Sequence, residues 1–203
     1  MKADHTQREV ENGFRQFDRC LDIVEYYLDP ERPFALRPHI ILELQKEAVE
    51  GIESQAGKLR MAAVGISKSE HAPPPPHLVE GLVREFCEYI NDHWHEENAF
   101  HLAAYAMWRL NWIHPFTDGN GRTARTLSYA LLCIKLGYVL PGSPTIPQQI
   151  EEDKTHYILA LEKADAAERE NNLDVSEMEQ MIKGMLGRQL MSVIEKAEGH
   201  QEK

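Results

Sequence analysis

Apolar residues recur every three to four positions along most of the chain, a spacing that places them on one face of an α-helix. This pattern predicts helices over residues 5–28, 38–51, 77–92, 97–113, 122–136, 148–169 and 174–198. The segment 122–136 is apolar nearly all round, which is typical of a buried central helix. Pro38 suits a first helical turn, and Gly51 and Gly137 suit helix ends. The pattern therefore predicts an all-α fold.

One stretch departs from the helical pattern. Polar and apolar residues alternate between Gly57 and Ile66, which predicts a short β-hairpin. The run Pro73 to Pro76 then predicts an extended link. We therefore expect a helical bundle with a small β-hairpin flap. It divides into N-terminal helices over 1–56, a core over 57–170 and a C-terminal helix within 171–203 that packs on the core.

Composition and charge restrict the classes of function. The chain has 203 residues, of which 42% are hydrophobic and 27% charged, the balance of a globular protein. Its formal net charge of −11 argues against sequence-independent binding to nucleic acid. The cysteines Cys20, Cys87 and Cys133 form no CxxC pair, so we expect small buried hydrophobes in a reducing compartment. The N-terminus lacks the apolar segment of a signal peptide and no apolar run could span a bilayer, so we expect a cytoplasmic protein without a membrane partner.

The polar break between two strongly apolar helices carries the chemistry. It reads HPFTDGNGRTAR, from His114 to Arg125. Its glycines allow a tight turn and a close approach of the backbone to a ligand. The turn leads into a helix N-terminus, where unpaired amides and the helix dipole attract anions. The segment therefore predicts an anion site.

Three kinds of side chain complete this site. Arg122 and Arg125 share one helix face, and guanidinium groups match phosphate oxygens in a bidentate way. Asp118 offers the hard oxygen ligand that a Mg²⁺–phosphate complex requires. His114 has an ordinary pKa near neutrality and can act as a base. The segment cannot be an EF-hand, because Arg122 stands where an oxygen ligand is needed, nor a Walker loop, because it lacks GK[ST].

The twelve residues match the Fic signature HPFx[DE]GNGRxxR at every specified position, so the chain resembles the Fic/DOC family. The resemblance extends to the 57–76 segment, which is similar to the family's flap, and to the helices on both sides of the motif. It implies transfer of AMP from ATP, with Mg²⁺, to a serine, threonine or tyrosine hydroxyl of a target protein. The glycine at position 121 favours nucleotidyl over phosphoryl transfer.

The resemblance also implies a role for each motif residue. His114 is the expected general base and Asp118 the expected Mg²⁺ ligand. The backbone of Gly119, Asn120 and Gly121 would bind the α- and β-phosphates. Arg122 and Arg125 would engage the β- and γ-phosphates.

Two further features are implied more weakly. Many family members carry an inhibitory helix with the pattern [ST]xxxE[GN], and Glu50-Gly51 matches its end, although Lys46 occupies the Ser/Thr position. Glu50 would then pair with Arg125 and restrain the enzyme; an exposed helix-end glutamate is the alternative. On the flap, Lys58, Leu59, Arg60 and Met61 are expected to dock the target.

Two other functions compete with transfer. Removal of AMP would need Glu50 to activate water, whereas a non-catalytic nucleotide-binding module would be marked by a damaged motif. The methionine-rich stretch Met178 to Met191 is interpreted as a contact face for a homodimer.

Overall fold

The computed structural model describes residues 2–67 and 69–198 of the chain. Within them the chain forms eight α-helices and one short 3₁₀ helix, and no strand. The helices are α1 (Lys2–Leu28), α2 (Pro38–Val49), α3 (Val79–Asp92), α4 (Ala99–Ile113), α5 (Asn120–Leu136), α6 (Ile146–Glu152), α7 (Thr155–Arg169) and α8 (Ser176–Glu198), with the 3₁₀ helix at Pro76–Leu78. The all-α prediction is confirmed.

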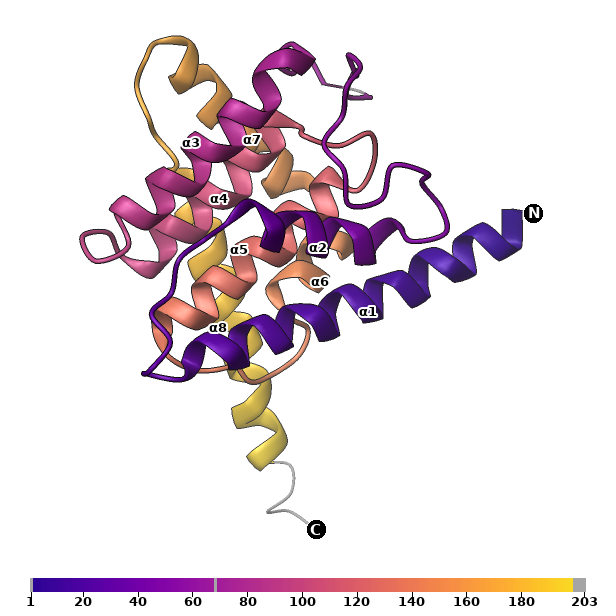
Figure 1. Cartoon of the computed structure of the whole chain (residues 1–203). Coiled ribbons are helices and arrows are strands. Elements are labelled where there is room, and N and C mark those ends of the chain that lie inside the picture. Colours follow the sequence, from indigo (N-terminus) through magenta and orange to yellow (C-terminus); the bar gives the residue numbers. More distant parts are fainter. Residues whose placement is uncertain (1, 68, 199–203) are drawn as a thin grey trace.

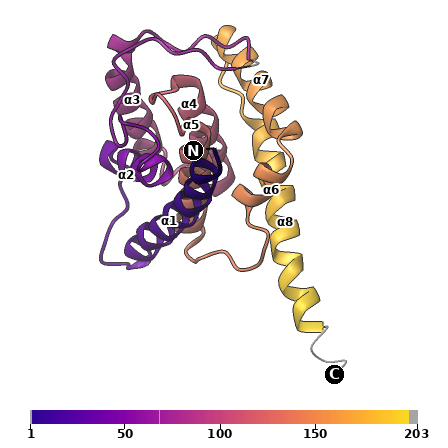
Figure 2. The same ribbon diagram turned by 90° about the vertical axis from the view of Figure 1, so that its right-hand side faces the viewer.

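Helix α5 lies at the centre of the molecule. The view in Figure 2 places α4 and α5 between α1, α2 and α3 on one side and α7 and α8 on the other. Every residue from Thr123 to Ile134 is buried, because neighbours cover all faces of the helix. The prediction of a buried central helix is therefore confirmed. Helix α1 crosses α5 and α2, and its N-terminal end projects beyond the body (Figure 1).

The predicted helix over residues 148–169 is divided in two. The capping box of Thr145 and Gln148 begins α6, with a proline in its first turn. The chain then becomes extended at Asp153, whose carboxylate accepts a hydrogen bond from the Thr155 amide at 2.9 Å and so begins α7. Local hydrogen bonds thus override the continuous helical pattern.

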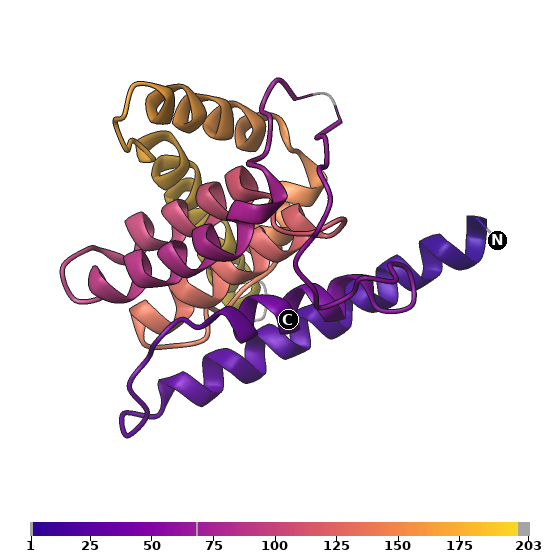
Figure 3. The same ribbon diagram turned by 45° about the horizontal axis from the view of Figure 1, so that its top comes forward.

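The predicted β-hairpin between Gly57 and Ile66 is wrong. This segment is irregular in the structure and continues into the long connection between α2 and α3 (Figure 3). The amide of Arg60 donates to the carbonyl of Pro115 at 2.9 Å, so it bonds to the motif loop rather than to a facing strand. The alternation of polar and apolar residues does not follow burial here, because polar Arg60 is buried and apolar Met61 is exposed.

Two predictions about sulfur-containing residues have different outcomes. The three cysteines are free and buried, as expected. The proposed dimer face on α8 is largely absent, because Met178 and Met185 are buried in the core of the chain itself. Among the methionines of this stretch, only Met191 is well exposed. Among the described residues no helix combines the length and apolarity needed to cross a membrane.

Candidate functional site

The motif forms a tight loop between the two most buried helices. Helix α4 ends at Ile113 and α5 begins at Asn120. The buried side chain of Asn120 accepts from the Phe116 amide and donates to the Phe116 carbonyl, both at 2.9 Å. These bonds fix the loop between the helices. Asn120 therefore shapes the anion site with its side chain, a contribution that the signature alone did not indicate.

Gly119 provides the close approach that the loop needs. Its φ of 81° lies in the left-handed region, and a Cβ there would stand 2.8 Å from Val49 Cγ1. As N-cap of α5 it supplies no side-chain cap for the first amides of the helix. Those amides and the positive end of the helix dipole thus face the loop, which is the arrangement that binds anions.

His114 stands at the C-terminal end of α4 in a left-handed conformation, with φ 50° and ψ 58°. Its Nδ1 lies 3.3 Å from the Asn111 carbonyl. A carbonyl only accepts, so this contact favours the tautomer with the proton on Nδ1 and a basic Nε2. Burial lowers the pKa of His114, and the charge of Arg60 lowers it further. The imidazole is therefore neutral near pH 7, as a base must be.

Arg122 and Asp118 are held together beside this loop. Arg122 Nη2 lies 3.1 Å from Asp118 Oδ2, and Nη1 donates to the Ala48 carbonyl at 2.9 Å. Asp118 also accepts from the Gly119 amide at 2.6 Å. Both side chains are thereby ordered at the entrance to the N-terminus of α5.

Arg125 has a carboxylate partner that the sequence did not suggest. Its buried guanidinium pairs with Glu151 of α6 at 2.5 Å, and Lys154 Nζ lies 2.8 Å from the same carboxylate. Burial opposes ionisation of Glu151, but the bond from Lys154 and the charges of Arg125 and Lys154 outweigh it and lower its pKa. Arg125 is thus paired with Glu151, where the sequence predicted Glu50. Glu50 is instead the C-cap of α2, and its carbonyl accepts from Asn12 at 3.0 Å.

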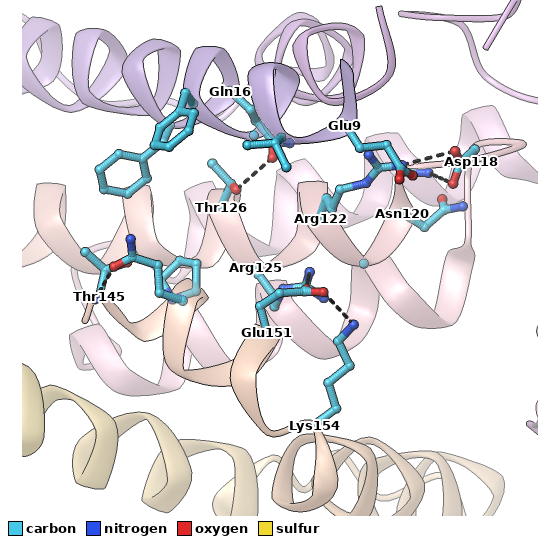
Figure 4. A pocket seen from close by; sticks show the side chains of 18 of the residues that line it. Glu9, Gln16, Asp118, Asn120, Arg122, Arg125, Thr126, Thr145, Glu151 and Lys154 are labelled. Carbon is cyan, nitrogen blue, oxygen red and sulfur yellow. Dashed lines mark hydrogen bonds and ion pairs between the residues drawn. The ribbon is translucent and has the colours of Figure 1, made fainter. Parts of the chain in front are cut away.

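The motif opens into a cavity of about 930 Å³. Residues His114, Asp118 to Arg122 and Arg125 line it, so the structure brings the predicted motif residues together. Figure 4 shows α1 along one side, with Glu9 beside Asp118 and Arg122, and Glu151 with Lys154 on the other. The sequence analysis did not predict that α1 forms one wall of this cavity. Val10 and Phe14 are apolar residues at the helical spacing of α1, yet both are well exposed and line the cavity.

Gln45 is a second contribution that sequence reasoning missed. It is fully buried on α2, donates to the Asp118 carbonyl at 3.0 Å and accepts from the Gly57 amide at 2.6 Å. It therefore ties the motif loop to the segment that follows α2. A polar residue inside the apolar stripe of Ile41, Leu44 and Ala48 was the available signal.

The four flap residues have different surroundings. Lys58 and Met61 are exposed, and Leu59 packs partly against the core. Arg60 is only 2% exposed, so the prediction that its side chain docks a target is wrong. Its guanidinium bonds to carbonyls of the protein itself, including that of His114 at 2.7 Å.

The residues present fit a Mg²⁺ ion bound together with phosphates. Magnesium in such sites takes one or two carboxylates and completes its octahedron with phosphate oxygens and water. Asp118 offers a half-exposed carboxylate in the cavity next to the anion-binding amides. It is the motif's one carboxylate, which matches a metal held jointly by protein and nucleotide.

Comparison with known proteins agrees with this geometry. The family model described as Fic/DOC family matches residues 35–132. The chain is 33% identical over 123 residues to the protein adenylyltransferase Fic of Drosophila persimilis. This match covers 60% of this chain and 23% of that protein. The match to the Drosophila grimshawi protein is 32% identical over 129 residues, 62% of this chain and 25% of the relative. The chain thus spans about a quarter of these relatives.

Solved structures show the same fold at low sequence identity. A Fic domain containing signaling protein from Bacteroides thetaiotaomicron superposes with a TM-score of 0.72 at 20% identity, over 93% of this chain and 73% of that one. Fic-1 from C. elegans (residues 134–508, E274G) superposes with a TM-score of 0.73 at 21% identity. The superposition covers 97% of this chain and 53% of that one.

Proposed function

The chain carries a Fic/DOC-family domain over residues 35–132, and from this premise we propose that it is a protein adenylyltransferase. Its substrates are MgATP and a protein that presents a serine, threonine or tyrosine hydroxyl. The observation that carries the proposal is the meeting of a neutral histidine, a helix N-terminus, a carboxylate and two arginines in one cavity. Nucleotidyl transfer needs a base, an anion cradle, a metal ligand and phosphate clamps, and each has a candidate here.

His114 acts as the general base in this proposal. Its Nε2 accepts the proton of the target hydroxyl while the hydroxyl oxygen attacks the α-phosphorus of ATP. The new O–P bond forms as the bond from the α-phosphorus to the bridging oxygen breaks, and pyrophosphate leaves. The hydrogen bond from Nδ1 to Asn111 supports this role because it orients the ring and fixes its tautomer.

The N-terminus of α5 and the two arginines bind the phosphates. The amides after Gly119 face the α- and β-phosphates, and Arg122 with Arg125 neutralises the β- and γ-phosphates. Asp118 would hold Mg²⁺, which would neutralise further phosphate charge.

Nucleotide labelling tests the proposal directly. The protein is incubated with Mg²⁺ and ATP labelled on the α- or the γ-phosphate, alone and with lysate, and GTP, UTP and CTP are compared. Transfer of the α-label without the γ-label is the expected result. Transfer of the γ-label would indicate phosphorylation, and no covalent label with any nucleotide would contradict the proposal.

A carboxylate on Arg125 restrains the site in this proposal. Glu151 supports the idea through its 2.5 Å ion pair, whereas Glu50 is the residue that the family resemblance names. Glu151→Gln should raise MgATP affinity by about two- to fivefold, a modest effect because the carboxylate is half exposed and shared with Lys154.

Glu50→Gly is the comparison for this measurement. Calorimetric titration and self-labelling are followed in both variants. If MgATP affinity and self-labelling rise only in Glu50→Gly, the restraint is assigned to Glu50. An unchanged MgATP affinity in Glu151→Gln would show that Glu151 does not restrain the site.

The exposed part of the 57–66 loop docks the target protein. Met61 supports this proposal, because its side chain is 91% exposed close to a segment that contacts the motif. Met61→Asp should lower transfer to protein targets about fivefold or more and leave MgATP affinity unchanged. Met191→Asp, at another exposed methionine, is the matched control. Equal labelling of a target by Met61→Asp and wild type would argue against docking there.

A further inference from the structure

Arg60 is a buried cation with an unusual set of partners. In the part of the chain that the structure describes, no carboxylate forms an ion pair with it. Its guanidinium donates instead to four carbonyls, those of His114 and Pro74 at 2.7 Å, Ala62 at 3.1 Å and Ile113 at 3.4 Å. A buried charge without a counter-charge is costly and needs compensation elsewhere.

The C-terminus of α4 provides that compensation. The last carbonyls of a helix lack partners within the helix and carry the negative end of its dipole, so a cation is favourable there. The His114 amide bonds to the Leu110 carbonyl and His71 Nε2 contacts the Trp112 carbonyl at 2.8 Å. Arg60 binds the next two carbonyls, of Ile113 and His114. The segment between α2 and α3 therefore caps α4 with side chains.

His114 has a backbone that requires such support. A positive φ is uncommon for a residue with a Cβ, and a residue before proline favours extended conformations. His114 nonetheless precedes Pro115 with φ 50°. Arg60 brackets this position, because Nε binds the His114 carbonyl and the Arg60 amide binds the Pro115 carbonyl at 2.9 Å. The same turn directs the histidine side chain to Asn111 and the cavity.

We propose that Arg60 is a positioning residue that caps α4 and holds His114 in the left-handed conformation from which its imidazole enters the cavity. Arg60 does not line the cavity, so it acts through His114. Its contribution to catalysis rests on the proposed function, but its contribution to the shape of the His114 turn does not.

Two measurements on the full chain separate these parts. The first is the ¹³Cα and ¹³Cβ chemical shifts of His114 in the free protein, which report its backbone conformation without any activity. The second is the maximal rate of AMP transfer together with the calorimetric affinity for MgATP. Arg60→Gln removes the positive charge and the several N–H donors of the guanidinium, whereas Arg60→Lys keeps the charge but cannot bind four carbonyls. Arg109→Gln is the matched control, because Arg109 is a mostly buried arginine on α4 whose guanidinium pairs with Glu168 at 2.8 Å and lies over the Trp112 ring instead of bonding to the motif loop.

In Arg60→Gln the His114 shifts should leave their left-handed values, and kcat should fall about tenfold or more while MgATP affinity changes less than twofold. Arg60→Lys should give His114 shifts and a kcat between those of Arg60→Gln and wild type. Arg60→Lys is the test variant if Arg60→Gln does not fold. Arg109→Gln should lower Tm without moving the His114 shifts. Unchanged His114 shifts in a folded Arg60 variant would overturn the proposal. If Arg60→Gln moves the His114 shifts but the wild-type protein itself transfers no nucleotide, the positioning role stands and the proposed function is contradicted instead.

Discussion

Replacing His114 by alanine should slow AMP transfer by about 10²–10⁴-fold, the usual loss when a general base is removed. The physical reason is that His114 is the motif's one group with an ordinary pKa near neutrality, and its Nδ1 contact leaves Nε2 free to accept a proton. MgATP affinity should remain within a few-fold of wild type, because the phosphates bind the helix N-terminus and the arginines. Single-turnover labelling and calorimetry measure the two quantities separately.

The pH dependence of the wild type checks the same assignment. Burial lowers the pKa of His114, so the ring stays neutral to a lower pH than an ordinary histidine would. Transfer should therefore persist as the pH falls through the ordinary histidine range, and it should be lost only below the lowered pKa. His39→Ala, at an exposed histidine on α2, should behave as wild type. A wild-type rate in His114→Ala would exclude this residue as the base.

The helical framework was predictable because burial repeats with the helical period. Helix α5 shows this most clearly, since a segment that is apolar all round can only be stable when neighbours surround it. Its end was also predictable, because Gly137 adopts φ 86° and its amide bonds to the carbonyls of Cys133 and Ile134. Periodicity could not reveal the break at Asp153, which depends on one side-chain bond to the Thr155 amide.

The prediction of a hairpin after α2 failed for a different physical reason. Alternation predicts a strand only when a facing strand takes up the backbone hydrogen bonds. Here the motif loop supplies that partner, through the carbonyl of Pro115. Arg60 can be buried because carbonyls at the end of α4 accept hydrogen bonds from its guanidinium. The sequence pattern of polar and apolar side chains cannot indicate such backbone acceptors.

The motif residues were predictable as a group and their partners were not. A signature states which side chains must meet a nucleotide, so the cavity of His114, Asp118 and Arg122 was expected. The pair of Arg125 with Glu151 joins residues 26 positions apart in sequence through the packing of α6 against α5. The partial match at Glu50 predicted a carboxylate partner for Arg125. The structure pairs Arg125 with Glu151, and inhibition by Glu50 stays a prediction.

Arg122→Ala should weaken MgATP binding about tenfold or more. A hydrogen bond to a charged group contributes roughly 1.5–3 kcal/mol, and about 1.4 kcal/mol corresponds to a tenfold change in affinity. Arg122 is already ordered by the Ala48 carbonyl and Asp118, so little conformational freedom is lost when phosphate binds. Arg122→Lys should show a smaller loss, because it keeps the charge but not the bidentate fork.

Asp118→Ala separates the phosphate clamp from the metal ligand. Calorimetric titrations are made with ATP in the presence of Mg²⁺ and in the presence of a chelator. Arg122→Ala should lose affinity under both conditions, because its guanidinium binds phosphate directly. Asp118→Ala should lose affinity only with Mg²⁺, and without the metal it should bind ATP at least as well as wild type, since a negative charge near the phosphates has been removed. Arg84→Ala, at an exposed arginine on α3 that pairs with Glu80, is the control for loss of one positive charge. Unchanged MgATP affinity in both Arg122→Ala and Asp118→Ala would contradict the phosphate site, because one of its two arginine clamps and its metal ligand would then contribute nothing to binding.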